Sequence, residues 1–201
     1  MRILCVGAHP DDVETGAGGF ITKMKKDCEN KLMVVVFSNC EEQKGNEGIA
    51  EEFNKSMQTF GIDNFRLLDF PNTRLPEHAA EIRTELEKIR DGFSPSMVVT
   101  HNMNSTHQDH KTLAEACIRV FRDSSILMYE ELKSTPKFVP NMFISLAPEE
   151  IENKVKALEC YKSQFRRYYF NMDYVRSLAH VRGKPIRKDF AEAFEVYQYV
   201  W

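Results

Sequence analysis

The sequence predicts an α/β protein with a Rossmann-like, doubly wound and mainly parallel sheet that carries helices on both faces. Three observations lead to this fold class. Short apolar runs typical of buried strands recur along the chain, segments with apolar residues at helical spacing separate them, and a length of 201 residues suffices to bury one sheet between two helix layers. Because an alternation of strands and helices favours right-handed crossovers, the strands should run parallel. We expect a single domain over residues 1–201.

The first part of the chain alternates clearly between strands and helices. Residues 3–6 form an apolar run that predicts a buried strand, and the segment 16–27, whose start is rich in glycine, is expected to be a helix. A second apolar run at residues 32–37 predicts the next strand. The apolar residues of segment 49–60 have helical spacing, and Gly61 is expected to end that helix.

The middle of the chain continues this alternation. A short strand is predicted at residues 66–68, a helix around the apolar positions of segment 82–89, and a strand at residues 97–100. A helix from about His107 shows the apolar stripe of a half-buried helix, with Thr106 as its expected N-cap. In a doubly wound sheet, the first and fourth strands are neighbours at the point where the strand order reverses.

Beyond residue 126 the pattern is weaker. Strands are predicted near residues 127–129 and 142–146, and helices near residues 149–163 and 172–181. A final run of alternating polar and apolar residues ends at Trp201.

Charge and composition exclude several classes of protein. A formal net charge of -3 and a pI near 6.1 leave no electrostatic footprint for nucleic acid or for an anionic membrane surface. The five cysteines are odd in number and lack a C-x-x-C pair, so we expect reduced thiols in a cytoplasmic protein. No apolar stretch approaches the length of a membrane span.

Two polar motifs follow predicted strands. The run A-H-P-D-D-V-E at residues 8–14 comes directly after the first strand, and H-Q-D-H at residues 107–110 comes after the fourth. Ligands of α/β proteins bind at the carboxyl ends of neighbouring parallel strands, so these two motifs should meet in space. Within each motif, polar side chains three residues apart share one face of a helical turn.

Side chains of the two motifs could hold one divalent metal ion. A catalytic zinc needs three nitrogen or carboxylate ligands and one open position for water, and His9, Asp12 and His110 supply such a set. The same ligands would accept iron or manganese. Asp11 is left over as a carboxylate that can take the proton of a metal-activated water. The alternative is that these acids only complement a helix dipole, which explains an isolated D-D-x-E string but not the second histidine cluster.

These motifs resemble those of a known family. The A-H-P-D-D-V-E run, the later H-Q-D-H and the alternating α/β pattern are similar to the PIG-L or LmbE-like de-N-acetylases, which act on N-acetylglucosaminyl phosphatidylinositol, on mycothiol and bacillithiol precursors and on some nucleotide-linked sugars. The resemblance implies that His9, Asp12 and His110 hold zinc. It also implies that Asp11 is the general base and that His107 assists as an acid or oxyanion stabiliser.

Asp109 has two roles open to it. In the first, it orients His107 and favours a charged imidazole, which would stabilise a tetrahedral oxyanion and deliver a proton to the leaving amine. In the second, it forms a capping box with Thr106 at the spacing of that motif, although glutamate or glutamine is the usual partner. Glu14 is expected to lie behind the ligands rather than among them.

Residues near other strand ends are candidates for binding the substrate. Arg74, in the turn-rich loop 69–76, could grip sugar hydroxyls or a phosphate, and Asn39 could do so from the loop after the second strand. His101, just past the fourth strand, either faces the site or is hydrogen-bonded locally. The basic, tyrosine-containing stretch from Lys162 onward either cradles an anionic or nucleotide group or is a solvated helix face with core aromatics.

The resemblance and the residues together predict a cytoplasmic, zinc-dependent hydrolase that removes the N-acetyl group from an amino sugar of N-acetylglucosamine type and releases acetate. The sugar could be free or linked to a nucleotide or phosphate group, and a homo-oligomer is left open. Two alternatives remain: another metal hydrolase such as a phosphoesterase, and a non-catalytic sugar- or nucleotide-binding module. A structural zinc normally has four protein ligands, and the evident set stops at three, which disfavours the module.

Overall fold

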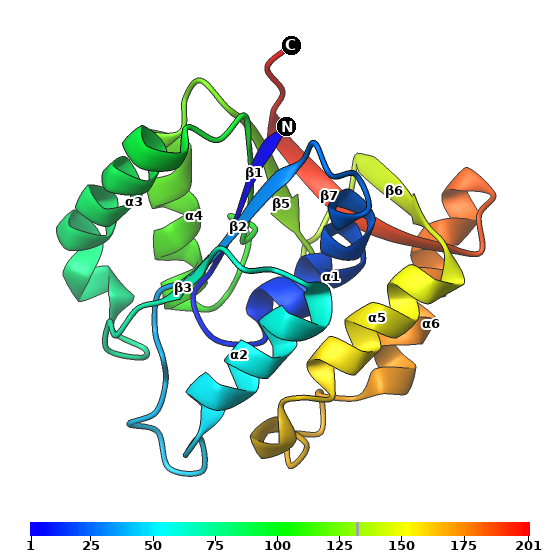
Figure 1. The fold of residues 1–201 in the computed structure, drawn as a ribbon, viewed down its shortest axis with the longest axis horizontal. Coiled ribbons are helices and arrows are strands. Elements are labelled where there is room, and N and C mark those ends of the chain that lie inside the picture. Colours follow the sequence, from blue (N-terminus) through cyan, green and yellow to red (C-terminus); the bar gives the residue numbers. More distant parts are fainter. Residues whose placement is uncertain (132) are drawn as a thin grey trace.

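A seven-stranded, mostly parallel sheet runs through the computed structural model, which describes residues 1–131 and 133–201 (Figure 1). In chain order the strands are β1 (Arg2–Gly7), β2 (Lys31–Val36), β3 (Phe65–Leu67), β4 (Met97–Thr100), β5 (Ser125–Tyr129), β6 (Met142–Leu146) and β7 (Phe190–Gln198). Their order in the sheet is β3-β2-β1-β4-β5-β7-β6. Strands β1 to β5 pair in parallel, and β7 is antiparallel to both β5 and β6.

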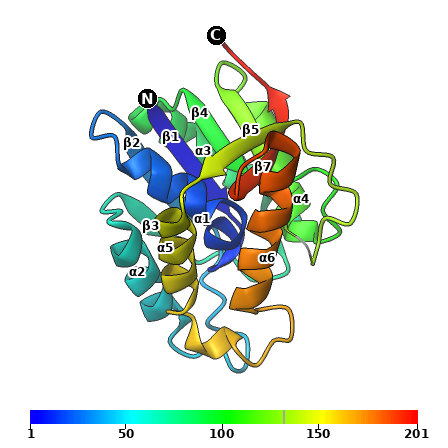
Figure 2. The same ribbon diagram turned by 90° about the vertical axis from the view of Figure 1, so that its right-hand side faces the viewer.

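Helices cover both faces of this sheet (Figures 1 and 2). In chain order the α-helices of the described residues are α1 (Asp12–Lys25), α2 (Ile49–Phe60), α3 (Ala79–Phe93), α4 (Gln108–Val120), α5 (Pro148–Leu158) and α6 (Met172–Gly183). Helices α3 and α4 lie on one face, and α1, α2 and α5 lie on the other, where α6 packs beside α5 and β7. Within residues 1–131 and 133–201, no helix has the length and apolar character that crossing a bilayer requires.

Each face of the sheet has its own hydrophobic core, because consecutive strand residues point to opposite faces. In β1, Ile3 and Cys5 belong to the core beneath α1 and α2, whereas Leu4 and Val6 belong to the core beneath α3 and α4. All four side chains are fully buried, as expected of a parallel strand with helices on both sides. This double burial explains the continuous apolar run in the sequence.

The predicted fold class is confirmed. Strand β1 pairs in parallel with β2 on one side and with β4 on the other, so the strand order reverses between β1 and β4. The register aligns Cys5 of β1 with Val34 of β2 and with Val99 of β4. Because parallel neighbours end at the same edge of the sheet, the two polar motifs emerge side by side there.

Helix α1 begins earlier than predicted, at Asp12 rather than near residue 16. Its glycine-rich segment lies inside the helix, where the absence of side chains lets the helix approach the sheet closely. A Cβ atom added at Gly16 would lie 2.2 Å from the ring of Tyr129, so a larger residue does not fit. The helix is kinked at Ala17, whose φ of -141° and ψ of 17° are not helical.

Two further boundaries differ from the prediction. Helix α4 takes His107 as its N-cap, and the predicted cap Thr106 instead donates its hydroxyl to the carbonyl of Ser134. Helix α5 ends at Leu158, earlier than predicted, and the chain then turns so that Tyr161 enters the core. The final alternating run is β7, which is inserted between β5 and β6.

Candidate metal centre

The candidate site lies at the carboxyl ends of three adjacent parallel strands, β1, β4 and β5. The loop after β1 carries His9 and leads to Asp12 in the first turn of α1. The loop after β4 leads to His110 in the first turn of α4, and Glu131 follows closely after β5. Segments far apart in the sequence therefore meet at one edge of the sheet.

Three potential ligand atoms converge at this edge. The Nδ1 atom of His9 lies 3.3 Å from Oδ2 of Asp12 and 3.3 Å from Nε2 of His110. The same Nε2 atom lies 3.5 Å from the same oxygen of Asp12. In a tetrahedral zinc site with bonds of about 2.0–2.1 Å, any two ligand atoms are roughly 3.3 Å apart. These three side chains therefore fit one small divalent ion, which would take a fourth ligand from solvent or substrate.

A buried carboxylate holds the second nitrogen of each histidine. His9 Nε2 lies 3.0 Å from Oδ2 of Asp109, and His110 Nδ1 lies 2.8 Å from Oε2 of Glu131. When each ring is neutral and its one proton is used in this contact, His9 turns an unprotonated Nδ1 and His110 an unprotonated Nε2 toward the common point. Such carboxylate–histidine pairs are the usual support of a metal-bound imidazole.

Both carboxylates are themselves held in place. Asp109 accepts hydrogen bonds of 2.8 and 3.1 Å from two backbone N–H groups in loop 73–75. The second oxygen of Glu131 lies 2.8 Å from Nδ1 of His101, whose ring stacks on that of His110 with 4.0 Å between centroids. All four side chains are buried, so the polar network is shielded from water and its geometry is fixed by packing.

The charges of the site favour a cation at its centre. Burial alone would lower the pKa of His9, but hydrogen bonds to Asp109 and Asp12 outweigh it and raise the pKa to about 10. Burial would in the same way raise the pKa of Asp12, yet the positive charges of His110 and His9 hold it well below its usual range. The negative charges of Asp12 and Asp109 thus stabilise a positive charge between them. Either a proton on His9 or a divalent metal ion supplies that charge.

The ligand atoms open onto a cleft of about 830 Å³. Of the non-glycine residues with positive φ in the described part of the chain, Asp11, Cys40 and Thr73 line this cleft. A left-handed backbone costs such residues on the order of 1–3 kcal/mol and is concentrated at functional sites. Asp11, with a φ of 87°, is the N-cap of α1 but makes no capping bond with its side chain. Burial and the negative charges of Asp12 and Glu14 raise the pKa of this carboxyl.

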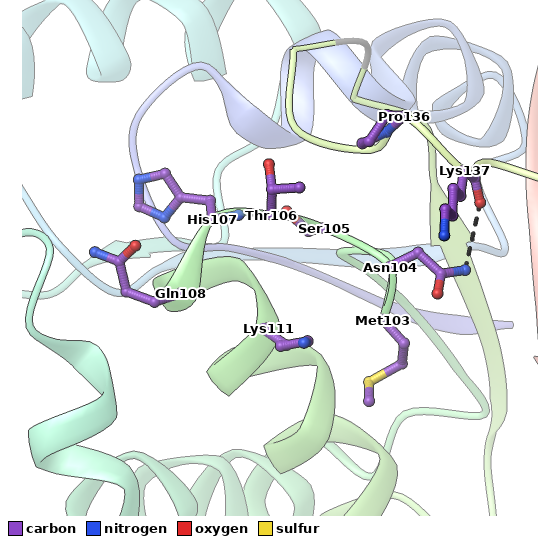
Figure 3. Close-up of a pocket in the computed structure, with 9 residues that line it drawn as sticks. All are labelled: Met103, Asn104, Ser105, Thr106, His107, Gln108, Lys111, Pro136 and Lys137. Carbon is purple, nitrogen blue, oxygen red and sulfur yellow. Dashed lines mark hydrogen bonds between the residues drawn. The ribbon is translucent and has the colours of Figure 1, made fainter.

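A second, smaller cavity of about 560 Å³ adjoins the cleft at His107, which lines both (Figure 3). The ring of His107 points away from Asn104 and Lys111 in this cavity and stacks on His110 with 4.4 Å between centroids. None of the three potential ligands lines the smaller cavity. The chemistry of the site therefore belongs to the larger cleft.

Comparisons with known proteins identify the family of the chain. Residues 4–121 match the model of the PIG-L family, described as GlcNAc-PI de-N-acetylase. The chain is 30% identical over 171 residues to the uncharacterized deacetylase YaiS of Escherichia coli (strain K12), a match that covers 80% of this chain and 90% of YaiS. The chain belongs to the PIG-L family.

One further sequence match and two solved structures are similar to this PIG-L protein over nearly the whole chain. The diacetylchitobiose deacetylase of Thermococcus kodakarensis is 24% identical over 218 residues, which cover 95% of the chain and 81% of that relative. The structure of N,N'-diacetylchitobiose deacetylase from Pyrococcus horikoshii, complexed with its inhibitor MPG, has a TM-score of 0.81 at 22% identity and covers 99% of this chain and 86% of its own. The 4-carboxy-2-hydroxymuconate hydratase GalB of Pseudomonas putida KT2440 has a TM-score of 0.78 at 15% identity, with coverage of 100% and 97%. Likeness of fold alone therefore does not decide the reaction.

The PIG-L motif residues lie where the sequence analysis expects them to meet. The structure brings His9, Asp12 and His110 together and places Asp11 on the same cleft. Metal ligation by the three side chains and proton transfer by Asp11 stay predictions.

One of the two roles predicted for Asp109 is wrong. Its carboxylate forms no capping box with Thr106, because its oxygens bind His9 and the backbone of loop 73–75. Its negative charge does act to raise the pKa of His107, so the role of Asp109 in orienting His107 and favouring a charged imidazole stays a prediction. The spacing of the PIG-L motif does place Asp109 in the first turn of α4, but the direction of its side chain depends on the loop after β3, which the sequence does not reveal.

The surroundings of His107 disfavour the charged imidazole predicted for it. Burial, together with the positive charges of His110 and His9, lowers the pKa of His107 to about 4. Its Nδ1 atom accepts a hydrogen bond of 3.3 Å from the backbone N–H of Asp109, so the proton of the neutral ring is on Nε2. His107 is thus a neutral hydrogen-bond donor at the cleft.

Neither loop residue predicted to bind substrate lines the cleft. The guanidinium of Arg74 pairs with the carboxylate of Glu77, three residues further along, and the side chain stays 61% exposed. The side-chain oxygen of Asn39 accepts a hydrogen bond of 3.2 Å from the backbone N–H of Glu41. Substrate contact by these two side chains stays a prediction, although Thr73, the neighbour of Arg74, does line the cleft.

Substrate contact by His101, by contrast, is wrong. His101 is fully buried, and its Nε2 accepts a hydrogen bond of 2.9 Å from the backbone N–H of Ala8. Its proton is therefore on Nδ1, directed at Glu131, and the pair supports His110 from behind. Sequence reasoning missed Glu131 altogether, since the single signal for it is an acidic residue soon after a predicted strand.

Proposed function

We propose that this protein is a zinc-dependent hydrolase that removes the N-acetyl group from an N-acetylated amino sugar or its conjugate and releases acetate. The observation that carries the proposal is the cluster of three ligand atoms 3.3–3.5 Å apart, with each imidazole supported by a buried carboxylate. Membership of the PIG-L family supports it. A set of two imidazoles and one carboxylate suits zinc and would also accept iron or manganese.

His9, Asp12 and His110 would hold the ion. When bound, zinc lowers the pKa of a coordinated water to about 7 and polarises an amide carbonyl. Asp11 takes the proton that the attacking water loses. Its place suits this task, because the carboxylate lines the cleft and makes no capping bond to its own helix.

His107 stabilises the species that the attack creates. Addition of water to the acetyl carbonyl carbon gives a tetrahedral oxyanion, to which the neutral imidazole of His107 donates a hydrogen bond from Nε2. Asp11 then returns its proton to the amide nitrogen, and the C–N bond breaks. The reaction consumes one water and yields acetate and a free amine.

The amino-sugar substrate is proposed from the relatives. The Thermococcus kodakarensis relative and the Pyrococcus horikoshii structure are both named diacetylchitobiose deacetylase. A cleft of about 830 Å³ has room for a sugar together with a further group. The five cysteines are free, which supports the cytoplasmic location expected from the sequence.

Acetate release by the zinc-loaded full chain tests the proposal. With N-acetylglucosamine and N,N'-diacetylchitobiose as substrates, we expect acetate and free amine in equal amounts. With p-nitrophenyl phosphate we expect no phosphate release, which would instead identify a phosphoesterase. If zinc is bound but no N-acetyl sugar in the panel yields acetate, the proposal fails and the binding module is favoured.

Asp11→Asn tests the assignment of the base. We expect this variant to bind zinc as the unsubstituted protein does and to lower kcat by about 10²–10⁴-fold, the usual contribution of a general base. Asp27→Asn, which changes an exposed aspartate outside the cleft, is the matched control and should alter neither quantity. Unchanged turnover in Asp11→Asn would refute the assignment.

A further inference from the structure

We propose that one end of the cleft is an anion-binding subsite, in which Lys133 and Arg167 hold a phosphate or carboxylate group attached to the N-acetyl sugar. This inference rests on the proposed function, because it assigns the chemistry of the remaining part of the same substrate. Both residues lie beyond residues 4–121, which match the PIG-L model, so the family match does not account for them.

The cleft has more room than a single sugar ring needs. Its volume of about 830 Å³ lies in the upper part of the range of roughly 300–1,000 Å³ that is usual for sites of drug-sized ligands. Its lining includes Asp11 and His107 of the candidate centre, and also Lys133 and the stretch 167–175. A substrate whose acetamide group lies at the centre can therefore extend toward Lys133 and Arg167.

Cationic side chains of the cleft fall into two pairs, and the first pair is neutralised. The ammonium group of Lys154 lies 2.6 Å from a carboxylate oxygen of Glu192, and both side chains are buried. The guanidinium of Arg182 binds the carboxylate of Glu130. These two cations therefore have little charge left for a ligand.

The second pair, Lys133 and Arg167, forms no ion pair in the described part of the chain, although the charge of Arg167 acts to lower the pKa of Asp11 in the same cleft. Within residues 1–131 and 133–201, neither side chain has a carboxylate oxygen at ion-pair distance. Instead, the hydroxyl oxygen of Tyr169 accepts hydrogen bonds from Lys133 Nζ at 3.2 Å and from Arg167 Nη1 at 2.6 Å. The ammonium group of Lys133 also lies over the ring of Tyr169, 4.3 Å from its centroid.

Tyr169 thus keeps two positive charges side by side although like charges repel. After their bonds to the hydroxyl, Lys133 and Arg167 retain further N–H donors, which can reach a ligand. A neutral sugar hydroxyl would accept some of these donors but would bring no negative charge to the pair. A phosphate or carboxylate would accept the donors and also neutralise the charges, so the geometry favours an anion.

Three N-acetylglucosamine compounds test the subsite in the zinc-loaded protein: the neutral methyl glycoside, the 1-phosphate and the carboxymethyl glycoside. The readout is selectivity, taken as kcat/KM for each anionic compound divided by kcat/KM for the neutral one. We expect the double variant Lys133→Ala/Arg167→Ala to lower this ratio about 10- to 100-fold through KM, since each lost charge-assisted hydrogen bond weakens binding. Arg119→Ala, an exposed arginine of α4 outside the cleft, is the control and should leave the ratio unchanged.

Calorimetric titration of the metal-free protein with N-acetylglucosamine 1-phosphate tests the same subsite without turnover and without binding of phosphate to zinc. We expect affinity to weaken about 10- to 100-fold in the double variant and to fall with added salt. Equal loss for neutral and anionic compounds, or equal titration curves for the double variant and the unsubstituted protein, overturns the subsite. Absence of acetate release from every compound overturns the proposed function instead, while the titration still decides the subsite. The phosphate and carboxylate compounds show which anion binds.

Discussion

The side chains that converge on the candidate ion come from one region of the chain, and part of their support comes from a second region. His9, Asp12 and His110 lie within the stretch that matches the PIG-L model, at the ends of β1 and β4. The region from β5 onward supplies Glu131, which binds His110. Ligands in the first region are recognisable from a local spacing, whereas the supporting residues of the second are recognisable only after the sheet has formed. The potential ligands thus lie in short motifs, and their orientation depends on residues that packing brings from other parts of the chain.

The C-terminal region also holds helix α1. The buried carboxylate of Glu14 accepts a hydrogen bond of 2.5 Å from the hydroxyl of Tyr161. Glu192 of β7 accepts hydrogen bonds from the backbone N–H groups of Gly19 at 2.9 Å and Phe20 at 2.6 Å, just after the kink in the helix. The contact of Glu192 satisfies backbone N–H groups that the kinked helix would otherwise leave unpaired in the interior. Hydrogen bonds from the C-terminal region therefore fix the position of helix α1, which carries Asp12.

The largest effect expected in this comparison is that of His110→Ala, which removes a ligand from the first region. Two remaining ligands are too few for a catalytic zinc site, so the dialysed variant should lose its zinc. Turnover of N-acetylglucosamine should fall by roughly 10³-fold or more, because the activated water and the polarised carbonyl are lost together. Atomic absorption measures the metal, and acetate release measures the turnover.

His78→Ala is the matched histidine control for that experiment. His78 ends the 3₁₀ turn Leu75–His78 and does not line the cleft. The control should keep its zinc and its turnover. A full zinc complement in His110→Ala would contradict the ligand set, because His110 supplies one of its three ligand atoms.

Most of the fold could be predicted from the sequence because its signals are local. Residues 3–6 are apolar on both faces of a strand, and Gly61 ends α2 with a φ of 67°, a conformation that glycine adopts easily. The position of β7 between β5 and β6 could not be predicted, since an alternating strand satisfies several places in a sheet equally well. The early start of α1 was hidden because its glycines serve close packing against Tyr129.

The candidate site could be predicted only in part, for a related reason. The spacing of His9 and Asp12 and the position of His110 after the fourth strand suffice to bring them together in a doubly wound sheet. The direction of Asp109 depends on the backbone of loop 73–75, and Glu131 depends on β5 lying beside β4. Such partners belong to tertiary structure, and no spacing along the chain indicates them.

Glu131→Gln should have a smaller effect than loss of a ligand, and it tests whether the second region supports the first. The carboxylate faces Nδ1 of both His110 and His101, each at 2.8 Å. A glutamine offers one oxygen and one NH₂ group, so one imidazole N–H then faces a donor. We expect zinc to bind about 10- to 100-fold more weakly, as is usual for loss of a carboxylate behind a ligating histidine.

Competition with a chelator of known affinity measures this change. Glu130→Gln is the matched control, because it alters the neighbouring carboxylate, which binds Arg182 rather than a histidine. Equal zinc affinity in Glu131→Gln and Glu130→Gln would show that Glu131 does not support the ligand His110. The second region would then contribute nothing to zinc binding through this contact.

The smallest expected effect is on stability and comes from Tyr161→Phe. The ring of Tyr161 is fully buried, and its hydroxyl is one of two donors to Oε1 of Glu14, the other being Ser56 at 2.9 Å. The second oxygen of Glu14 has no partner in the described part of the chain, so the variant leaves a buried carboxylate with a single donor. We expect the free energy of unfolding in urea to fall by about 1–3 kcal/mol, the usual effect of losing a buried hydrogen bond to a charged group.

The control Tyr168→Phe removes a hydroxyl from a side chain that is 92% exposed and should change the free energy of unfolding by no more than about 0.5 kcal/mol. If the two variants unfold alike, Tyr161 does not hold the first helix, and the dependence of the motif on the C-terminal region is confined to Glu131 and Glu192.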